Sequence, residues 1–177
     1  PNPIVGAIVV SDGVVVGSGY HQEAGAPHAE VHALSAAGPA AKGATLFCTL
    51  EPCCHTGRTG PCVEQIVESG IRRVVVAVED PNPLVARGGI SFLRDQGVQV
   101  EVGLCGREAF QVNRDFFTFI RYNRPFVTMK IALSKDRCTT SKEGSRAIIT
   151  STTANRHAHL LRAEVDAIGV GSGTIAT

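Results

Sequence analysis

The stretch ATLFCTLEPCCHTGRTGPCVEQIVESG, residues 44–70, decides the fold because it is typical of a strand, a loop and a helix in succession. Its apolar start, ATLFCTL (44–50), predicts a strand, and VEQIVESG (63–70) predicts a helix that ends at a glycine. Between and beside them lie the cysteines of the loop: Cys53, Cys54 and Cys62. We therefore expect thiols where a strand passes into the following helix.

The sequence on both sides of this stretch continues the alternation of strands and helices. Apolar β-branched runs predict the strands, and glycines mark the ends of the helices. The expected elements are strands 4–10 and 14–20 as a hairpin, helix 28–38, strand 73–80, helix 90–97, strand 98–103 and helix 108–122. Strands that alternate with helices of about ten residues predict a three-layer α/β sheet.

A break at Asn-Arg-Pro (123–125) separates this pattern from the rest of the chain. We expect a domain boundary there, with domains at 1–122 and 123–177. In the second domain PFVTMKIAL (125–133) predicts a strand, and residues 152–171 predict a helix followed by a strand. The chain starts without methionine and stops inside GVGSGTIAT, so we expect a piece of a longer protein that lacks both ends.

Composition narrows the classes of function. The 177 residues are 44% hydrophobic, which suffices for a packed core. Lys and Arg total 17 against 16 Asp and Glu, so the net charge of +1 predicts no nucleic-acid partner and favours a small-molecule substrate. No apolar run reaches about 18 residues and nothing resembles a signal peptide, so we expect no membrane partner and a cytoplasmic location. Self-association into a homo-oligomer is compatible with the sequence.

Four side chains predict a zinc site with a catalytic role. His28 and Glu30 form His-Ala-Glu at a helix start, and a strand delivers Cys53 to its carboxyl end. Open α/β sheets bind ligands at these positions. Cys62 begins the next helix, where the helix dipole favours a thiolate. One imidazole and two thiolates suit tetrahedral zinc and leave a fourth position for water.

Two neighbouring residues offer alternative ligands. Cys54 adjoins Cys53 and could replace it in the metal shell, although Pro52 directly precedes Cys53. His32 lies one helical turn after His28, but the two cysteines already complete the set, which favours a packing or solvent role for His32.

Zinc deaminases carry His-x-Glu followed by Pro-Cys-x-x-Cys, with the glutamate moving protons. This chain departs from that signature because eight residues separate Cys53 from Cys62. With this longer spacing it resembles the riboflavin-biosynthesis bifunctional deaminase-reductase family. The segments that carry the resemblance, in order, are PNPIVGAIVV, HQEAGAPHAE, LEPCCHTGRTGPC and VEDPNP.

The resemblance implies a cytidine-deaminase-like domain, missing its N-terminal helix, that hydrolyses 2,5-diamino-6-(5-phosphoribosylamino)pyrimidin-4(3H)-one to 5-amino-6-(5-phosphoribosylamino)uracil and ammonia. It implies that His28, Cys53 and Cys62 hold zinc and that Glu30 moves protons. His55 and Arg58 would meet the phosphorylated tail, although Arg58 could be a plain surface cation and Asn2 a turn residue. The substrate contacts that the resemblance implies are Asn2, His21, His55, Arg58, Asp80 and Asn82.

From residue 123 the chain resembles the truncated start of that family's dihydrofolate-reductase-like α/β domain, which uses NADPH. The implied contacts with substrate or cofactor are Lys130, Thr150 and Arg162. Arg137 stands where the family usually has glycine, which puts the local turn in doubt. Residues 123–177 are too few for a cofactor cleft, so we expect reductase activity only of an intact protein.

Other classes of function remain as alternatives at this point. A deaminase of guanine or of tRNA adenosine shares the ligands but normally has the short cysteine spacing. A structural zinc module would need a fourth ligand, for which Cys54 or His55 is nearest in sequence. A protein that only binds its ligand would keep the fold without Glu30.

Overall fold

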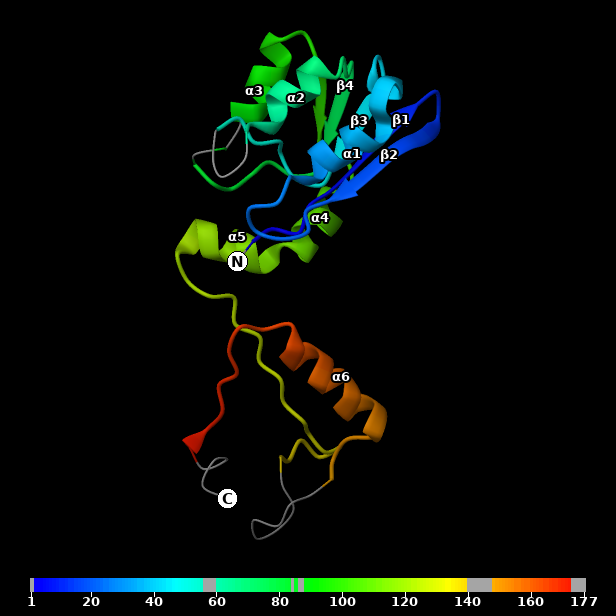
Figure 1. Cartoon of the computed structure of the whole chain (residues 1–177). Coiled ribbons are helices and arrows are strands. Elements are labelled where there is room, and N and C mark those ends of the chain that lie inside the picture. Colours follow the sequence, from blue (N-terminus) through cyan, green and yellow to red (C-terminus); the bar gives the residue numbers. More distant parts are fainter. Residues whose placement is uncertain (1, 56–59, 84, 86–87, 140–147, 173–177) are drawn as a thin grey trace. The chain divides into compact units, whose positions relative to one another are not determined.

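A mixed five-stranded sheet in the order β2-β1-β3-β4-β5 organises the first part of the chain (Figure 1). The computed structural model describes residues 2–55, 60–83, 85, 88–139 and 148–172. β1 pairs with β2 and β3 in antiparallel fashion, whereas β3, β4 and β5 are parallel. The strands are β1 (Gly6–Ser11), β2 (Val14–Tyr20), β3 (Thr45–Cys48), β4 (Arg73–Val76) and β5 (Gln99–Val102).

Three helices cover one face of this sheet: α1 (Ala29–Ala37), α2 (Cys62–Glu68) and α3 (Gly88–Asp95). A short 3-10 turn, η1 (Gly38–Ala41), follows α1. Alternate strand residues, among them Val9, Leu46 and Val74, are fully buried against the helices. The opposite face, with Ile8 and Phe47, borders a hollow of about 790 Å³. The α/β class and the elements expected between residues 4 and 103 are confirmed, with shifts of their ends.

Two glycines of β2 let α1 lie against the strand. A Cβ on Gly17 would stand 2.2 Å from the carbonyl oxygen of Ala33, and one on Gly19 would stand 2.5 Å from that of Ala29. Glycine is the residue that permits such close contact between backbones. Since His28 and Glu30 belong to the start of α1, these glycines also set the position of both side chains.

The helix expected at 108–122 is instead two helices, α4 (Gly106–Val112) and α5 (Arg114–Tyr122). Asn113 separates them with non-helical backbone angles, φ −110° and ψ 21°. Phe116 and Phe117 of α5 pack with Leu50, at the end of the sheet where β3 terminates. The periodicity of apolar residues continues across the junction, which is why the sequence pattern did not reveal it.

The chain divides into two compact units, Pro1–Phe126 and Val127–Thr177. In the second unit α6 (Thr152–Ala163) forms as expected, with Ser151 accepting a hydrogen bond from the Ala154 N–H at its start. The strands expected at 125–133 and after α6 were wrong, since the described residues there form no strand.

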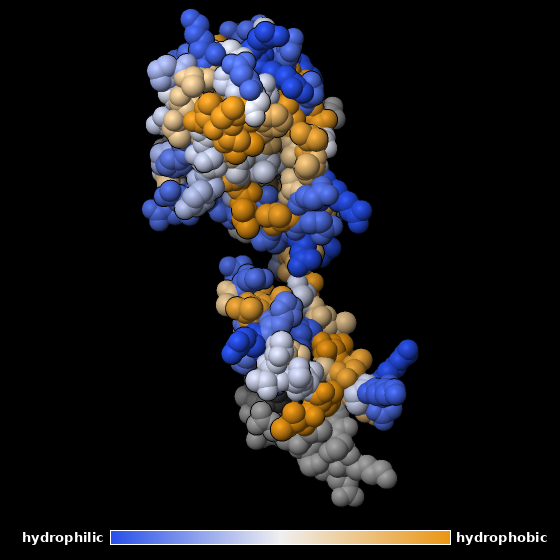
Figure 2. All heavy atoms as spheres, turned by 90° about the vertical axis from the view of Figure 1, so that its right-hand side faces the viewer, coloured by the Kyte–Doolittle hydropathy of each residue, from blue (hydrophilic) through white to orange (hydrophobic). Residues whose placement is uncertain are grey.

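A physical reason for their absence lies in the second unit itself. A strand needs a neighbour for its N–H and C=O groups, and the described residues of this unit supply none. Apolar surface is visible on this unit in Figure 2, and Val127, Met129 and Ile148 are 74%, 80% and 90% exposed. Among the described residues, none of the helices in either unit has the length and apolar character needed to cross a bilayer.

Candidate metal and catalytic site

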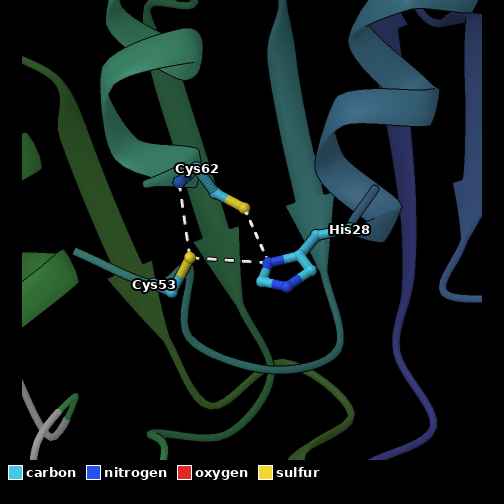
Figure 3. Close-up of side chains that lie close together, drawn as sticks. All are labelled: His28, Cys53 and Cys62. Atoms are coloured by element: carbon cyan, nitrogen blue, oxygen red, sulfur yellow. Dashed lines mark hydrogen bonds between the residues drawn. The ribbon is translucent and has the colours of Figure 1, made fainter. Parts of the chain in front are cut away.

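Three potential metal donors converge where β3 ends and where α1 and α2 begin (Figure 3). The Nδ1 atom of His28 lies 3.1 Å from the Cys62 Sγ and 3.5 Å from the Cys53 Sγ. The three donor atoms all lie within 4.8 Å of one another, as ligands of one small cation must. The side chains expected to hold zinc are therefore brought together by the fold.

Helix starts explain why these side chains meet. His28 is the residue before α1 and has extended backbone angles, while Cys62 is the first residue of α2 and follows Pro61. The free N–H groups of α2 meet Cys53, whose Sγ accepts the Cys62 N–H at 3.4 Å and whose carbonyl accepts the Val63 N–H at 3.3 Å. The start of α2 thus favours negative charge on Cys53.

The two thiols share their protons unequally. A hydrogen bond from the Cys62 thiol and, against the effect of burial, the hydrogen bond with the His28 ring together lower the pKa of Cys53 to about 4. The hydrogen bond between the two thiols raises the pKa of Cys62, with burial as the next cause. The contact with Cys53 also raises the pKa of His28. A divalent cation would stabilise a donor set that consists of a thiolate, a thiol and an imidazole.

Glu30 is 3% exposed and belongs to the first turn of α1. Burial raises the pKa of its carboxyl group to about 7, so proton uptake and release occur near neutral pH. Its Oε2 atom is buried and has no hydrogen-bond partner among the described residues. A buried acceptor of this kind beside soft donors fits a zinc site whose fourth position holds water.

The two alternative ligands lie outside the donor group. The Cys54 Sγ instead lies against Gly88 at the start of α3, where a Cβ added to the glycine would be only 2.6 Å from the sulfur. His32 is not among the donors that meet in the described part of the chain, and its buried Nε2 lacks a hydrogen-bond partner there. This arrangement favours Cys53 over Cys54.

Asn2 and His21 form a hydrogen-bonded chain next to His28. The His21 Nδ1 donates to the carbonyl of Pro27 at 3.3 Å, which leaves Nε2 to accept from the Asn2 Nδ2 at 2.8 Å. The His21 ring contacts the His28 ring edge-on, with 5.4 Å between centroids. Both residues expected to contact substrate therefore adjoin the donor group.

Asp80 lies close enough to Cys53 and His55 for their charges to act on its carboxyl group. The Asp80 Oδ1 accepts the Asn82 N–H at 2.8 Å. Burial raises the pKa of Asp80, while the nearby His55 acts in the opposite direction. His55 is exposed. Arg58, the residue expected to meet a phosphate, lies outside the described residues.

Glu51 is a residue of the site that the sequence interpretation missed. Its carboxylate is 3% exposed and accepts the Asp80 N–H at 3.2 Å through Oε2 and the Ile90 N–H at 3.2 Å through Oε1. It thereby ties the loop of Asp80 and the start of α3 to the end of β3. The only signal in the sequence was an acidic residue directly before Pro-Cys.

The residues expected to serve the reductase lie in the second unit. Lys130 and Arg162 are exposed, and Arg162 lies 3.4 Å from a ring nitrogen of His159. Thr150, which lies just before α6, donates a hydrogen bond to the Oδ1 of Asn155 within α6 at 2.6 Å. None of these three lines the hollow beside Ile8 and Phe47.

Comparison with known proteins finds relatives over nearly the whole chain. Residues 1–78 match the family model of the cytidine and deoxycytidylate deaminase zinc-binding region, and residues 125–177 match that of the RibD C-terminal domain. The riboflavin biosynthesis protein RibD of Aquifex aeolicus is 53% identical over 99% of this chain and 49% of its own length. Over nearly its whole length the chain is similar to RibD proteins. RibD of Escherichia coli is 47% identical over 99% of the chain and 48% of its own length.

Solved structures of RibD proteins have the same fold. The deaminase/reductase of Thermotoga maritima matches with a TM-score of 0.92 and 38% identity, over 100% of this chain and 51% of that one. RibD of Acinetobacter baumannii matches with a TM-score of 0.85 and 44% identity, over 92% of this chain and 46% of that one. The chain spans about half the length of the RibD proteins that it matches.

Proposed function

We propose that residues 1–122 form a zinc-dependent deaminase of riboflavin biosynthesis. Its substrate is 2,5-diamino-6-(5-phosphoribosylamino)pyrimidin-4(3H)-one, and its products are 5-amino-6-(5-phosphoribosylamino)uracil and ammonia. The observation that carries this proposal is the convergence of His28, Cys53 and Cys62 beside the buried carboxyl group of Glu30. The long Cys53–Cys62 spacing and the likeness to RibD proteins support the phosphorylated pyrimidine over guanine or tRNA adenosine.

Each side chain has a defined task in this reaction. His28, Cys53 and Cys62 would hold zinc, which supplies the Lewis acidity that makes water acidic near neutral pH. Glu30 accepts the proton of the attacking water and returns it to the departing amine, so one carboxyl group serves as base and then as acid. Its pKa of about 7 suits both steps.

Two groups of residues would orient the substrate. Asn2 and His21 would contact it beside His28, and Asp80 and Asn82 would contact it near Cys53. His55 and Arg58 would meet its phosphate by charge-assisted hydrogen bonds. The enzyme would work in the cytoplasm on this small molecule, without nucleic acid.

Residues 123–177 are proposed as the start of the NADPH-dependent reductase domain. The likeness of residues 125–177 to the RibD C-terminal domain supports this assignment. Lys130, Thr150 and Arg162 would take part in substrate or cofactor binding once the domain is complete. The reductase activity is proposed for the intact protein.

Replacement of Glu30 by glutamine tests the deaminase proposal. Glu30→Gln retains the size of the side chain but cannot accept a proton, so zinc should still bind while ammonia release falls by about 10²-fold or more. Glu64→Gln is the matched control, because Glu64 occupies the first turn of α2 and is exposed. Ammonia release from the phosphorylated pyrimidine at the wild-type rate by Glu30→Gln would remove Glu30 from the reaction. If the wild type released ammonia faster from guanine than from the phosphorylated pyrimidine, guanine would be the substrate instead.

A further inference from the structure

Asn113, at the junction of α4 and α5, pairs with the backbone of Ile4 through both ends of its amide. Its Oδ1 accepts the Ile4 N–H at 2.7 Å, and its Nδ2 donates to the Ile4 carbonyl at 2.8 Å. The side chain is 2% exposed. A primary amide is the side chain suited to this pairing, because it offers one donor face and one acceptor face as a neighbouring strand would.

The segment around Ile4 is hydrogen-bonded on its other side as well. The Val5 carbonyl accepts the His21 N–H at 3.0 Å, which extends the pairing of β1 with β2 by one step. In extended chain, successive residues direct their backbone groups to opposite sides. Asn113 therefore supplies hydrogen-bond partners on one side of a short segment, while His21, directly after β2, pairs with it on the other side.

This doubly held segment ends at the candidate substrate contacts. Asn2 precedes it by two residues and donates to the His21 ring, which in turn donates to Pro27, next to His28. Asn2 itself is exposed, so burial does not hold it in place. The backbone of Asn2 is fixed from Ile4, and Ile4 is fixed by Asn113.

We propose that Asn113 is a positioning residue of the deaminase: it holds the 2–5 segment so that Asn2 and the His21 ring present a defined hydrogen-bonding edge to the substrate. This inference rests on the proposed function for its effect on catalysis, but not for its effect on His21. Without the amide, Asn2 loses its fixed backbone and the Asn2–His21 hydrogen bond loosens. The donors His28, Cys53 and Cys62 do not depend on this contact.

The test uses the zinc-loaded chain and two variants that break the pairing from opposite ends. Asn113→Leu keeps the branched shape and the number of side-chain heavy atoms of asparagine, but it can neither accept nor donate a hydrogen bond. Ile4→Pro removes the N–H at the other end, and its side chain is 65% exposed, so little packing changes. Val112→Leu is the control, since it puts leucine at an exposed position one residue earlier.

The first measurement needs no substrate. The ring nitrogen signals of His21, assigned by their loss in His21→Gln, report the hydrogen bond from Asn2 to Nε2. Both variants should shift the Nε2 signal toward that of Asn2→Ala, whereas Val112→Leu should leave it in place. An unchanged Nε2 signal in both variants overturns the inference whether or not the chain deaminates anything.

The second measurement separates positioning from general stability. Asn113→Leu should raise KM for the phosphorylated pyrimidine by about fivefold to tenfold, the scale of one or two lost hydrogen bonds, with kcat and zinc content near those of the wild type. In an Asn2→Ala background the same change should alter KM by less than about twofold, because the contact through which it acts is already gone. Equal fold-changes in both backgrounds would show a structural role only and would overturn the inference. If wild type releases no ammonia, the proposed function fails while the His21 result still decides this one.

Discussion

The contact between β2 and α1 predicts that a methyl group added at Gly19 disturbs metal binding. A Cβ on Gly19 would lie 2.5 Å from the Ala29 carbonyl oxygen and from the His32 Cβ, and 2.6 Å from the Ala33 N. Ordinary contact begins near 3.4 Å, so α1 must withdraw by about 0.9 Å, the difference between 3.4 and 2.5 Å. Ala29 directly follows His28, so this shift moves the imidazole relative to both thiolates.

Zinc tolerates such a displacement poorly, because its ligand distances hold to about 0.2 Å. We expect Gly19→Ala to weaken zinc binding about tenfold or more and to lower the free energy of unfolding by about 1–3 kcal/mol, the usual cost of overpacking. Competition with a chromophoric chelator measures the first effect and urea denaturation the second. Gly6→Ala is the control, since its Cβ would meet nothing closer than the Gly19 carbonyl at 4.0 Å. Zinc affinity of Gly19→Ala equal to that of Gly6→Ala would refute this account of how α1 is positioned.

Three further changes test other parts of the site. Cys53→Ser should lose zinc while Cys54→Ser retains it, as measured by metal content after gel filtration, and equal loss in both variants would contradict the choice of Cys53 as ligand. Glu51→Gln leaves one of the two N–H groups, the buried one of Ile90 or the part-buried one of Asp80, without an acceptor, so urea denaturation should show a loss of about 1–3 kcal/mol in the free energy of unfolding. Unchanged stability would remove the structural role of Glu51. Arg58→Ala should weaken binding of the phosphorylated pyrimidine by about 10- to 150-fold and should hardly change binding of the dephosphorylated one, as measured by the two dissociation constants. If binding of both weakens equally, Arg58 has a structural role and does not contact the phosphate.

The sequence predicted those features that neighbouring residues encode. The hairpin of β1 and β2, the start of α1 at His28 and the start of α2 after Pro61 all follow from local patterns. The donor group follows from residue types at helix starts and strand ends, because that edge of an α/β sheet collects them.

Features that depend on contacts between distant residues could not be predicted. Glu51 and Ile90 are 39 positions apart, and Asn113 and Ile4 are 109 apart, so no local pattern marks either pair. The strand expected at 125–133 was wrong for a related reason. Its alternating apolar residues indicate a strand, but a strand forms only beside another, and the described residues of the second unit provide no partner.

The separation of the three donors along the chain affects how stable the protein would be in a cell. Cys53 is 25 positions from His28 and 9 from Cys62, so a metal ion held by all three would cross-link segments that are distant in the sequence. Binding to the folded form alone adds about 1.4 kcal/mol of stability for each tenfold rise of free zinc above the dissociation constant. Starvation for zinc would then expose the chain to proteases at the same time as it stops turnover. The abundance of the protein, and not only the proposed deaminase activity, would follow the supply of metal.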